Sequence, residues 1–179
     1  SQRLESARDR AIKSLSTPRH LALLNELVSA AAMPRVTELG NSASKDVLPE
    51  LVDRSFRRLA RRVKQLELEG PAEVWHEARI SAKRARYSAE AVSGVFGGPA
   101  KRLADALSEV TEILGDHQDA CIAQDVLREM AATDGIDGRT GFALGLLHEH
   151  EFETELHNRL EFKRIWPHVR RVHKSTKLA

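Results

Sequence analysis

The chain has few aromatic residues, a single cysteine and no long hydrophobic run. Aromatic residues make up only 4% of it, which argues against a β-sandwich, because such cores are usually rich in aromatic and β-branched side chains. The lone Cys121 excludes an internal disulfide and is typical of a reducing compartment. No apolar stretch approaches the ~20 residues of a transmembrane helix, and no secretory signal pattern occurs. We therefore expect a cytoplasmic protein without membrane contact.

Recognisable catalytic patterns are lacking too. The sequence contains no Gly-rich phosphate loop, no His-Glu-x-x-His pair and no nucleophile elbow. Among the eight histidines, His148 and His150 would point to different sides of a helix. The Glu-x-x-His spacing of carboxylate metal sites occurs only at Glu73 and His76, where the cations that follow would repel a metal ion. We therefore expect no enzyme, no bound metal and no cofactor.

The sequence does contain helical spacing of apolar residues from end to end, without convincing strand alternation. The expected helices cover roughly residues 3–16, 18–33, 47–69, 72–96, 99–132 and 140–163, with a short basic helix after Pro167. Thr17-Pro18 is typical of an N-cap with proline at the first helical position. Gly97-Gly98-Pro99 is a stop signal, and Gly115 is a candidate break. The pattern predicts an all-α, antiparallel helical bundle that forms a single domain over residues 1–179.

A stripe of cations distinguishes the helix expected over residues 72–96. At 100° per residue, its members fall within an arc of about 100°, namely His76, Arg79, Lys83, Arg86 and Tyr87. Like charges at these spacings repel one another, so we expect an anionic ligand to complete them. The preceding helix repeats the spacing in a second stripe, Arg54, Arg57, Arg61 and Lys64. Because Gly70-Pro71 should make the two helices antiparallel neighbours, we expect both stripes to line one basic groove.

The alternative is that these charges form a solvated face or are neutralised internally. The acidic residues of the helix expected over 99–132 share one side, as Asp105, Glu109, Glu112, Asp116 and Asp119. That side is opposite an apolar seam of leucines and valine, so the acids should face outward and leave the first stripe largely unneutralised. His117 continues the apolar seam. It is either a core histidine with a satisfied ring or a ligand at the edge of a polar cleft.

Two segments carry a resemblance to a known family. The string WHEARISAKRARYSAE, followed by LSEVTEILGDHQDACIAQDVL, resembles the second half of the CHAD domain, the conserved histidine α-helical domain. The first motif falls on His76, Arg79, Lys83-Arg84 and Arg86-Tyr87, and the second on Leu114, Gly115, His117 and Asp119. The family also carries a His- and Arg-rich helix in its first half, and no such helix precedes residue 54. The resemblance therefore suggests either a chain that lacks part of the N-terminal bundle or a divergent short member of the family.

The resemblance implies two helical bundles with basic stripes around a central channel, which bind inorganic polyphosphate, in some cases on polyphosphate granules. The expected polyphosphate-binding residues are His76, Arg79, Lys83, Arg84, Arg86, His117, Arg57, Arg61, Lys64, Lys101, Arg102 and Arg19. Tyr87 and Asp119 are expected to orient them. One alternative is an RNA-binding helical protein, although few aromatic residues are available to stack on bases. The other is an accessory domain of a phosphoanhydride-processing enzyme. The sequence does not determine the oligomeric state.

Overall fold

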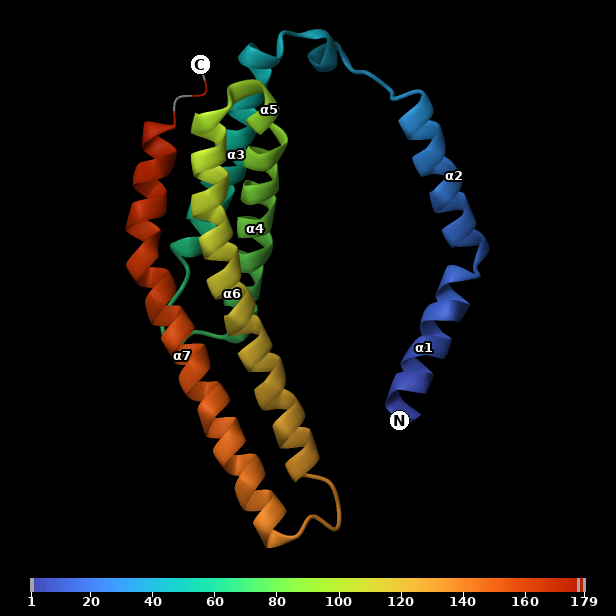
Figure 1. Cartoon of the computed structure of the whole chain (residues 1–179), viewed down its shortest axis with the longest axis vertical. Coiled ribbons are helices and arrows are strands. Elements are labelled where there is room, and N and C mark those ends of the chain that lie inside the picture. The colour runs from blue at the N-terminus through green and yellow to red at the C-terminus, as the bar shows by residue number, and fades with distance from the viewer. Residues whose placement is uncertain (1, 177, 179) are drawn as a thin grey trace. The chain divides into compact units, whose positions relative to one another are not determined.

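The computed structural model describes residues 2–176 and 178, and all regular structure in this part of the chain is helical (Figure 1). The elements are α1 (Gln2–Leu15), α2 (Pro18–Ala32), the 3-10 turn η1 (Glu38–Asn41), α3 (Ser44–Val63), α4 (Ala72–Ala91), α5 (Ser93–Phe96), α6 (Gly98–Ala131) and α7 (Gly138–Ser175). The predicted all-α fold is confirmed. None of the described helices is both long enough and apolar enough to span a membrane.

The chain divides into two compact units, Ser1–Ser42 and Ala43–Ala179, which are described separately. The prediction of a single domain stays a prediction. In the first unit, α1 and α2 meet at Thr17, whose side-chain oxygen accepts a hydrogen bond from the backbone N–H of His20 at 3.3 Å. Pro18 opens α2, as the Thr-Pro pair predicts.

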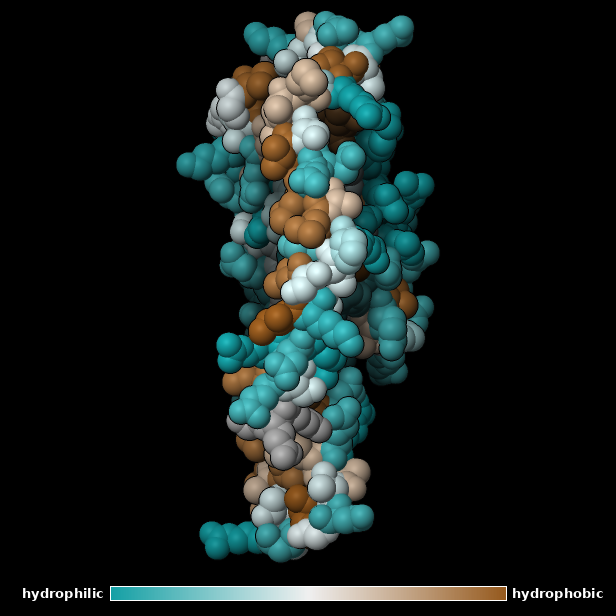
Figure 2. Space-filling model, turned by 90° about the vertical axis from the view of Figure 1, so that its right-hand side faces the viewer, coloured by the Kyte–Doolittle hydropathy of each residue, from teal (hydrophilic) through white to brown (hydrophobic). Residues whose placement is uncertain are grey.

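The apolar side chains of the first unit are largely uncovered. No residue of α2 is buried, and the helix exposes its large hydrophobic residues Leu21, Leu23, Leu24, Leu27 and Val28. Brown, hydrophobic residues appear among the hydrophilic ones on the surface that Figure 2 shows. Helices with such faces gain most of their stability from packing against another apolar surface.

The second unit is built around the four helices α3, α4, α6 and α7. Helix α4 packs on both α3 and α6, and α6 also packs on α7. Phe56 of α3 stacks on Trp166 and His173 of α7, with ring centroids 5.7 Å and 3.7 Å away. The helices therefore follow one another around the bundle in the order α3, α4, α6, α7, so that the α4–α6 boundary and the α3–α7 boundary lie on opposite sides.

Small and large apolar residues close this core together. Helix α4 contributes four fully buried alanines, Ala78, Ala82, Ala85 and Ala89, which let its neighbours approach closely. Helix α6 contributes the predicted seam, Leu103, Leu107, Val110 and Leu114, and each of these is at most 1% exposed. Helix α7 adds Phe162, Ile165 and Val169. Beyond this core, α6 and α7 continue as a long two-helix hairpin (Figure 1).

Helix α3 ends earlier than predicted, at Val63 rather than at residue 69. The segment from Lys64 to Pro71 makes up for the lost helical hydrogen bonds with side-chain partners. Trp75 Nε1 donates to the carbonyl of Glu67 at 3.1 Å. The Arg159 guanidinium donates to the carbonyls of Leu68 and Gly70. Both partners come from outside the segment, so local sequence patterns do not reveal where the helix ends.

The predicted break at Gly115 and the predicted separate helix after Pro167 are both wrong, because α6 and α7 are continuous through these positions. Proline lacks an N–H, so Pro167 leaves the carbonyl of Lys163 without its helical donor. Both residues are exposed, and water can take the donor's place. Ile165 and Val169, on either side of the proline, are buried in the core and hold the helix against it on both sides of Pro167.

Candidate functional site

The first stripe lies along the boundary between α4 and α6. At one end, His76 Nδ1 is 2.6 Å from Oε1 of Gln118 on α6. At the other end, Arg86 Nη1 donates to the Thr111 hydroxyl at 2.9 Å. Between these contacts stand Arg79 and Lys83, which are half-buried. We call the surface formed by His76, Arg79, Lys83 and Arg86 the α4–α6 face.

The positive charge of this face is only partly neutralised. Arg86 Nε lies 3.3 Å from a carboxylate oxygen of Glu90, one helical turn away. Within the described part of the chain, no carboxylate lies within 4.0 Å of Arg79 or Lys83. Arg79 Nε is buried and has no hydrogen-bond partner. Two half-buried cations without a counter-ion are what an anionic ligand would complete.

The acidic stripe of α6 does not supply those counter-ions. Its members Asp105, Glu109, Glu112, Asp116 and Asp119 are all exposed, as predicted from their position opposite the apolar seam. Glu112 accepts a hydrogen bond from the Ser108 hydroxyl at 3.2 Å. On this side of the bundle, the acidic residues of α6 and the basic residues of α4 therefore lie on separate, neighbouring surfaces.

The second stripe points elsewhere, and the predicted groove shared by the two stripes is not formed. The side of α3 that meets α4 is marked by the ion pair between Arg62 and Glu77, at 3.6 Å. Arg57, Arg61 and Lys64 lie between ~100° and ~160° around the helix from Arg62. The stripes of α3 and α4 therefore lie on different faces of the bundle, although the two helices are adjacent and antiparallel. The reason is that each stripe is rotated around its helix axis away from the buried side of that helix.

The remaining predicted residues are dispersed. Lys101 and Arg102 are exposed at the start of α6, and Arg102 is ~13 Å along the helix from Thr111. Arg84 is exposed on α4, and Arg19 is exposed in the first unit. Tyr87 lies beneath the Arg86 guanidinium, whose central carbon is 5.0 Å from the ring centroid. That cation–π contact fits its predicted orienting role.

His117 is an internal hydrogen-bond acceptor, which corrects its assignment to the ligand-contacting residues. It is only 1% exposed, and its Nε2 accepts from Nε of Arg159 at 3.0 Å. Its ring stacks on Trp75 with centroids 5.3 Å apart. Burial, and next the positive charge of Arg159, lower the pKa of His117 to about 4. The ring is therefore neutral near pH 7, and the core-histidine alternative describes it.

Arg159 is the residue that the sequence analysis missed. It is 6% exposed, and its guanidinium ties α7 to α6 through His117, to the loop after α3 through Leu68 and Gly70, and to Glu155 one turn earlier. Glu155 in turn accepts from Nε2 of Gln124 at 2.7 Å. The spacing of Glu155 and Arg159 indicates an ion pair, but nothing local links that pair to His117.

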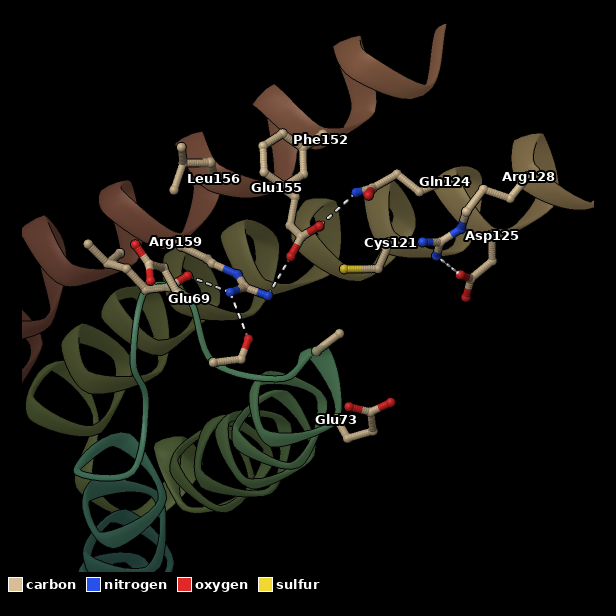
Figure 3. Close-up of a pocket in the computed structure, with 13 residues that line it drawn as sticks. Glu69, Glu73, Cys121, Gln124, Asp125, Arg128, Phe152, Glu155, Leu156 and Arg159 are labelled. Carbon is tan, nitrogen blue, oxygen red and sulfur yellow. Dashed lines mark hydrogen bonds and ion pairs between the residues drawn. The ribbon is translucent and has the colours of Figure 1, made fainter. Parts of the chain in front are cut away.

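A cavity of about 570 Å³ opens beside this network (Figure 3). Its ionic groups are largely paired with each other, Arg159 with Glu155 and Arg128 with Asp125. Glu69 and Glu73 add two further carboxylates to its wall. Carboxylates outnumber guanidinium groups there by four to two, so the cavity is a poor site for a polyanion.

The same cluster contains a possible set of metal ligands. Ligand atoms of His117, Cys121 and Glu155 lie within 4.8 Å of one another. However, the Arg159 guanidinium already donates to His117 and Glu155. Burial, and next the charge of Glu155, raise the pKa of the Cys121 thiol to about 12, which disfavours the thiolate that a metal needs. The Arg159 guanidinium thus takes the place of a metal ion as the positively charged partner of His117 and Glu155.

We accordingly expect well below one equivalent of zinc or iron in protein purified without chelator, measured by elemental analysis. A Cys121→Ala variant, handled identically, serves as the control because it removes the thiol ligand. One zinc per chain in the unmodified protein, lost in the variant, would show that Arg159 yields its place to a metal ion.

Comparisons with known proteins agree with this architecture. The family model of the CHAD domain matches residues 1–128. Two curated Mycobacterium tuberculosis proteins, the uncharacterized proteins MT2285 (strain CDC 1551 / Oshkosh) and Rv2226 (strain ATCC 25618 / H37Rv), are each 26% identical over 84% of this chain. The alignment spans only 29% of those relatives' length.

A solved structure, PptA from Streptomyces chartreusis, superposes with a TM-score of 0.71 at 24% identity. That alignment covers 91% of this chain and 59% of PptA, so the likeness concerns the fold. The family match spans both sequence motifs, the cationic stripe of α4 and the segment around His117. The chain therefore belongs to the CHAD domain family.

Proposed function

We propose that this protein binds inorganic polyphosphate, without catalysing a reaction, through the α4–α6 face. The observation that carries the proposal is the pair of half-buried cations, Arg79 and Lys83, with no carboxylate within 4.0 Å in the described residues. The polyphosphate-related binding known for the CHAD family supports it. A cytoplasmic location close to polyphosphate granules is the matching expectation.

The spacing of the cations favours a linear polymer over a single phosphate. Residues three and four positions apart on one side of a helix rise by ~5–6 Å along its axis. Arg79, Lys83 and Arg86 therefore form a row that successive phosphate groups of one chain can contact together. Arginine holds phosphate oxygens through paired N–H donors, and lysine adds a point charge. A monophosphate would satisfy only one member of the row.

The test is a titration of polyphosphate into the protein and into a variant with Arg79→Ala, Lys83→Ala and Arg86→Ala, at several salt concentrations. Losing one charge-assisted hydrogen bond worth ~1.5 kcal/mol already weakens binding ~10-fold, so we expect at least that loss. By analogy with single-stranded nucleic acid, each lost phosphate contact removes ~0.7 from the log–log salt slope. The triple variant should therefore flatten the slope by ~2.

The matched control removes three exposed cations from α1, with Arg8→Ala, Arg10→Ala and Lys13→Ala, because it changes the net charge equally. We expect its affinity to stay close to that of the unmodified protein. If the folded α4 variant binds polyphosphate with the same affinity as the unmodified protein, the α4–α6 face is a solvated surface and not a binding site. Competition by RNA as effective as polyphosphate would instead favour the nucleic-acid alternative.

The burial of His117 bears on the pH dependence of binding. A histidine that becomes protonated beside a polyanion strengthens binding as the pH falls from about 8 to 6. His117 is buried and its pKa is about 4, so it stays neutral over that range. His117 therefore adds no pH dependence to polyphosphate binding over that range.

A further inference from the structure

A second cationic surface lies along the boundary between α3 and α7. We call it the α3–α7 face, and its members are Arg57, Arg61 and Lys64 of α3 with Lys163, Arg170 and Lys174 of α7. All six are exposed. The sequence analysis assigned the three α3 residues to the same groove as the α4 stripe, but the structure separates them from it.

The contacts between α3 and α7 fix which side chains flank this boundary. His173 Nε2 lies 3.0 Å from a carboxylate oxygen of Asp53, and Phe56 stacks on both His173 and Trp166. On α3, Arg57 and Lys64 lie within ~40° of Asp53 around the helix axis. On that side of α3 they border α7.

The α7 members flank the same boundary from the other helix. Lys163 and Arg170 lie within ~60° of Trp166 around the helix axis. Lys174 lines a cavity of about 300 Å³ together with Asp53. Helices α3 and α7 run antiparallel (Figure 1), so Arg57 lies at nearly the same height along the bundle as Arg170, and Lys64 at nearly the same height as Lys163.

Few acids oppose these charges. Arg57 pairs with Glu50 at 2.7 Å and with Asp53 at 2.9 Å, which neutralises one end of the face. For the other five cations, no carboxylate lies within 4.0 Å among residues 2–176 and 178. They form two short rows, one on α3 and one on α7.

We infer that the α3–α7 face is a second site for a linear phosphate polymer, so that the four-helix unit is bivalent and long chains link protein molecules into a network. The inference rests on the proposed function, because it takes the same polymer as ligand. The two faces lie on opposite sides of the bundle, and a helix with its side chains is ~10–12 Å across. A short chain bound to one face therefore cannot reach the other.

Polyphosphate fits this face better than nucleic acid does. Trp166, the aromatic residue at its centre, is stacked between Phe56 and Phe162, with centroids 5.7 Å and 5.9 Å away. These two contacts already occupy the ring and leave less of it to stack on a base. The cations here are exposed rather than half-buried, so each contact is more strongly screened by solvent. The second site should be weaker than the α4–α6 face.

The first experiment titrates short polyphosphate, of a length that covers one face only, by calorimetry at low salt. The whole protein should bind two chains, one tightly and one weakly. A variant with Lys64→Ala, Lys163→Ala and Arg170→Ala should keep the tight chain and lose the weak one. The variant of Arg79, Lys83 and Arg86 should do the reverse. The α1 triple variant, with the same change in net charge, should keep both.

The second experiment adds long-chain polyphosphate and follows light scattering. The unmodified protein should form large assemblies where the charges of protein and polyphosphate balance, and salt should dissolve them. The α4 triple variant and the α3–α7 triple variant should each bind along single polyphosphate chains without linking them. One bound short chain per protein, or two that survive the α3–α7 changes, would overturn the second site. No binding, or binding that ignores the α4 changes, would instead overturn the proposed function, so the two failures are distinct. RNA that assembles the protein as well as polyphosphate does would overturn the choice of polymer.

Discussion

Replacing Arg159 with methionine is expected to destabilise the second unit by roughly 3–5 kcal/mol, the range seen when one partner of a buried ion pair is removed. Methionine fills similar space but leaves Glu155 charged and the carbonyls of Leu68 and Gly70 without their donor. His117 loses the hydrogen bond from Arg159 Nε as well. The measurement is urea unfolding at pH 7, monitored by circular dichroism. The free energies of unfolding are compared with the same dependence on urea concentration for both proteins.

The matched control is Arg164→Met, which removes another α7 arginine that pairs with a glutamate. Arg164 and Glu161 form an exposed pair, and such pairs contribute ~0–1 kcal/mol. A second variant, Arg159→Met with Glu155→Gln, should recover part of the loss, because the stranded buried charge is gone. If Arg159→Met unfolds at the same urea concentration as Arg164→Met, the network has no structural role.

Acidification is expected to cost stability through His117, in a pH window set by its pKa. The unfolded chain takes up a proton near the ordinary value of 6.5, whereas the folded chain does so only near 4. Between these values the unfolded state binds more protons, so the free energy of unfolding falls as the pH falls. From pH 7 to pH 5 the loss should be roughly 2 kcal/mol, and below pH 4 roughly 3 kcal/mol in total.

The test compares urea unfolding at pH 7 and pH 5 for the protein and for His117→Gln. The glutamine carbonyl can still accept from Arg159 but does not titrate. The variant should therefore lose roughly 2 kcal/mol less on acidification. His173, whose pKa is also lowered by burial, acts in the same direction in both proteins and cancels. Equal losses in the two would mean that His117 is protonated in the folded protein too.

Local patterns predicted the helices well wherever the chain itself supplies the stop or start. Thr17 and Pro18 open α2 as expected, and Gly97 has a positive φ of 58° just before α6. The apolar seam of α6 and the outward acids followed from the 3.6-residue period. They could be predicted because each depends only on residues within a few turns of one helix.

What failed depended on partners far away in the sequence. The end of α3 depends on Arg159, and the continuity of α7 across Pro167 depends on core packing on both sides of it. The position of His117 in the apolar seam left two readings open, and only the contact with α7 decides between them. The separation of the two cationic stripes likewise depends on the angle, around each helix axis, between the stripe and the buried side of that helix. This angle can be interpreted only when the neighbouring helices are known.

The bonds from Arg159 to Leu68 and Gly70 join positions 91 and 89 residues apart, and this has a consequence for synthesis on the ribosome. The family match ends at residue 128, so a nascent chain of that length already carries both motifs. It lacks α7, however, and with it Phe162, Ile165 and Val169, which close the core. Closing so long a loop comes late, and until α7 emerges the core of the four-helix unit lacks these three side chains.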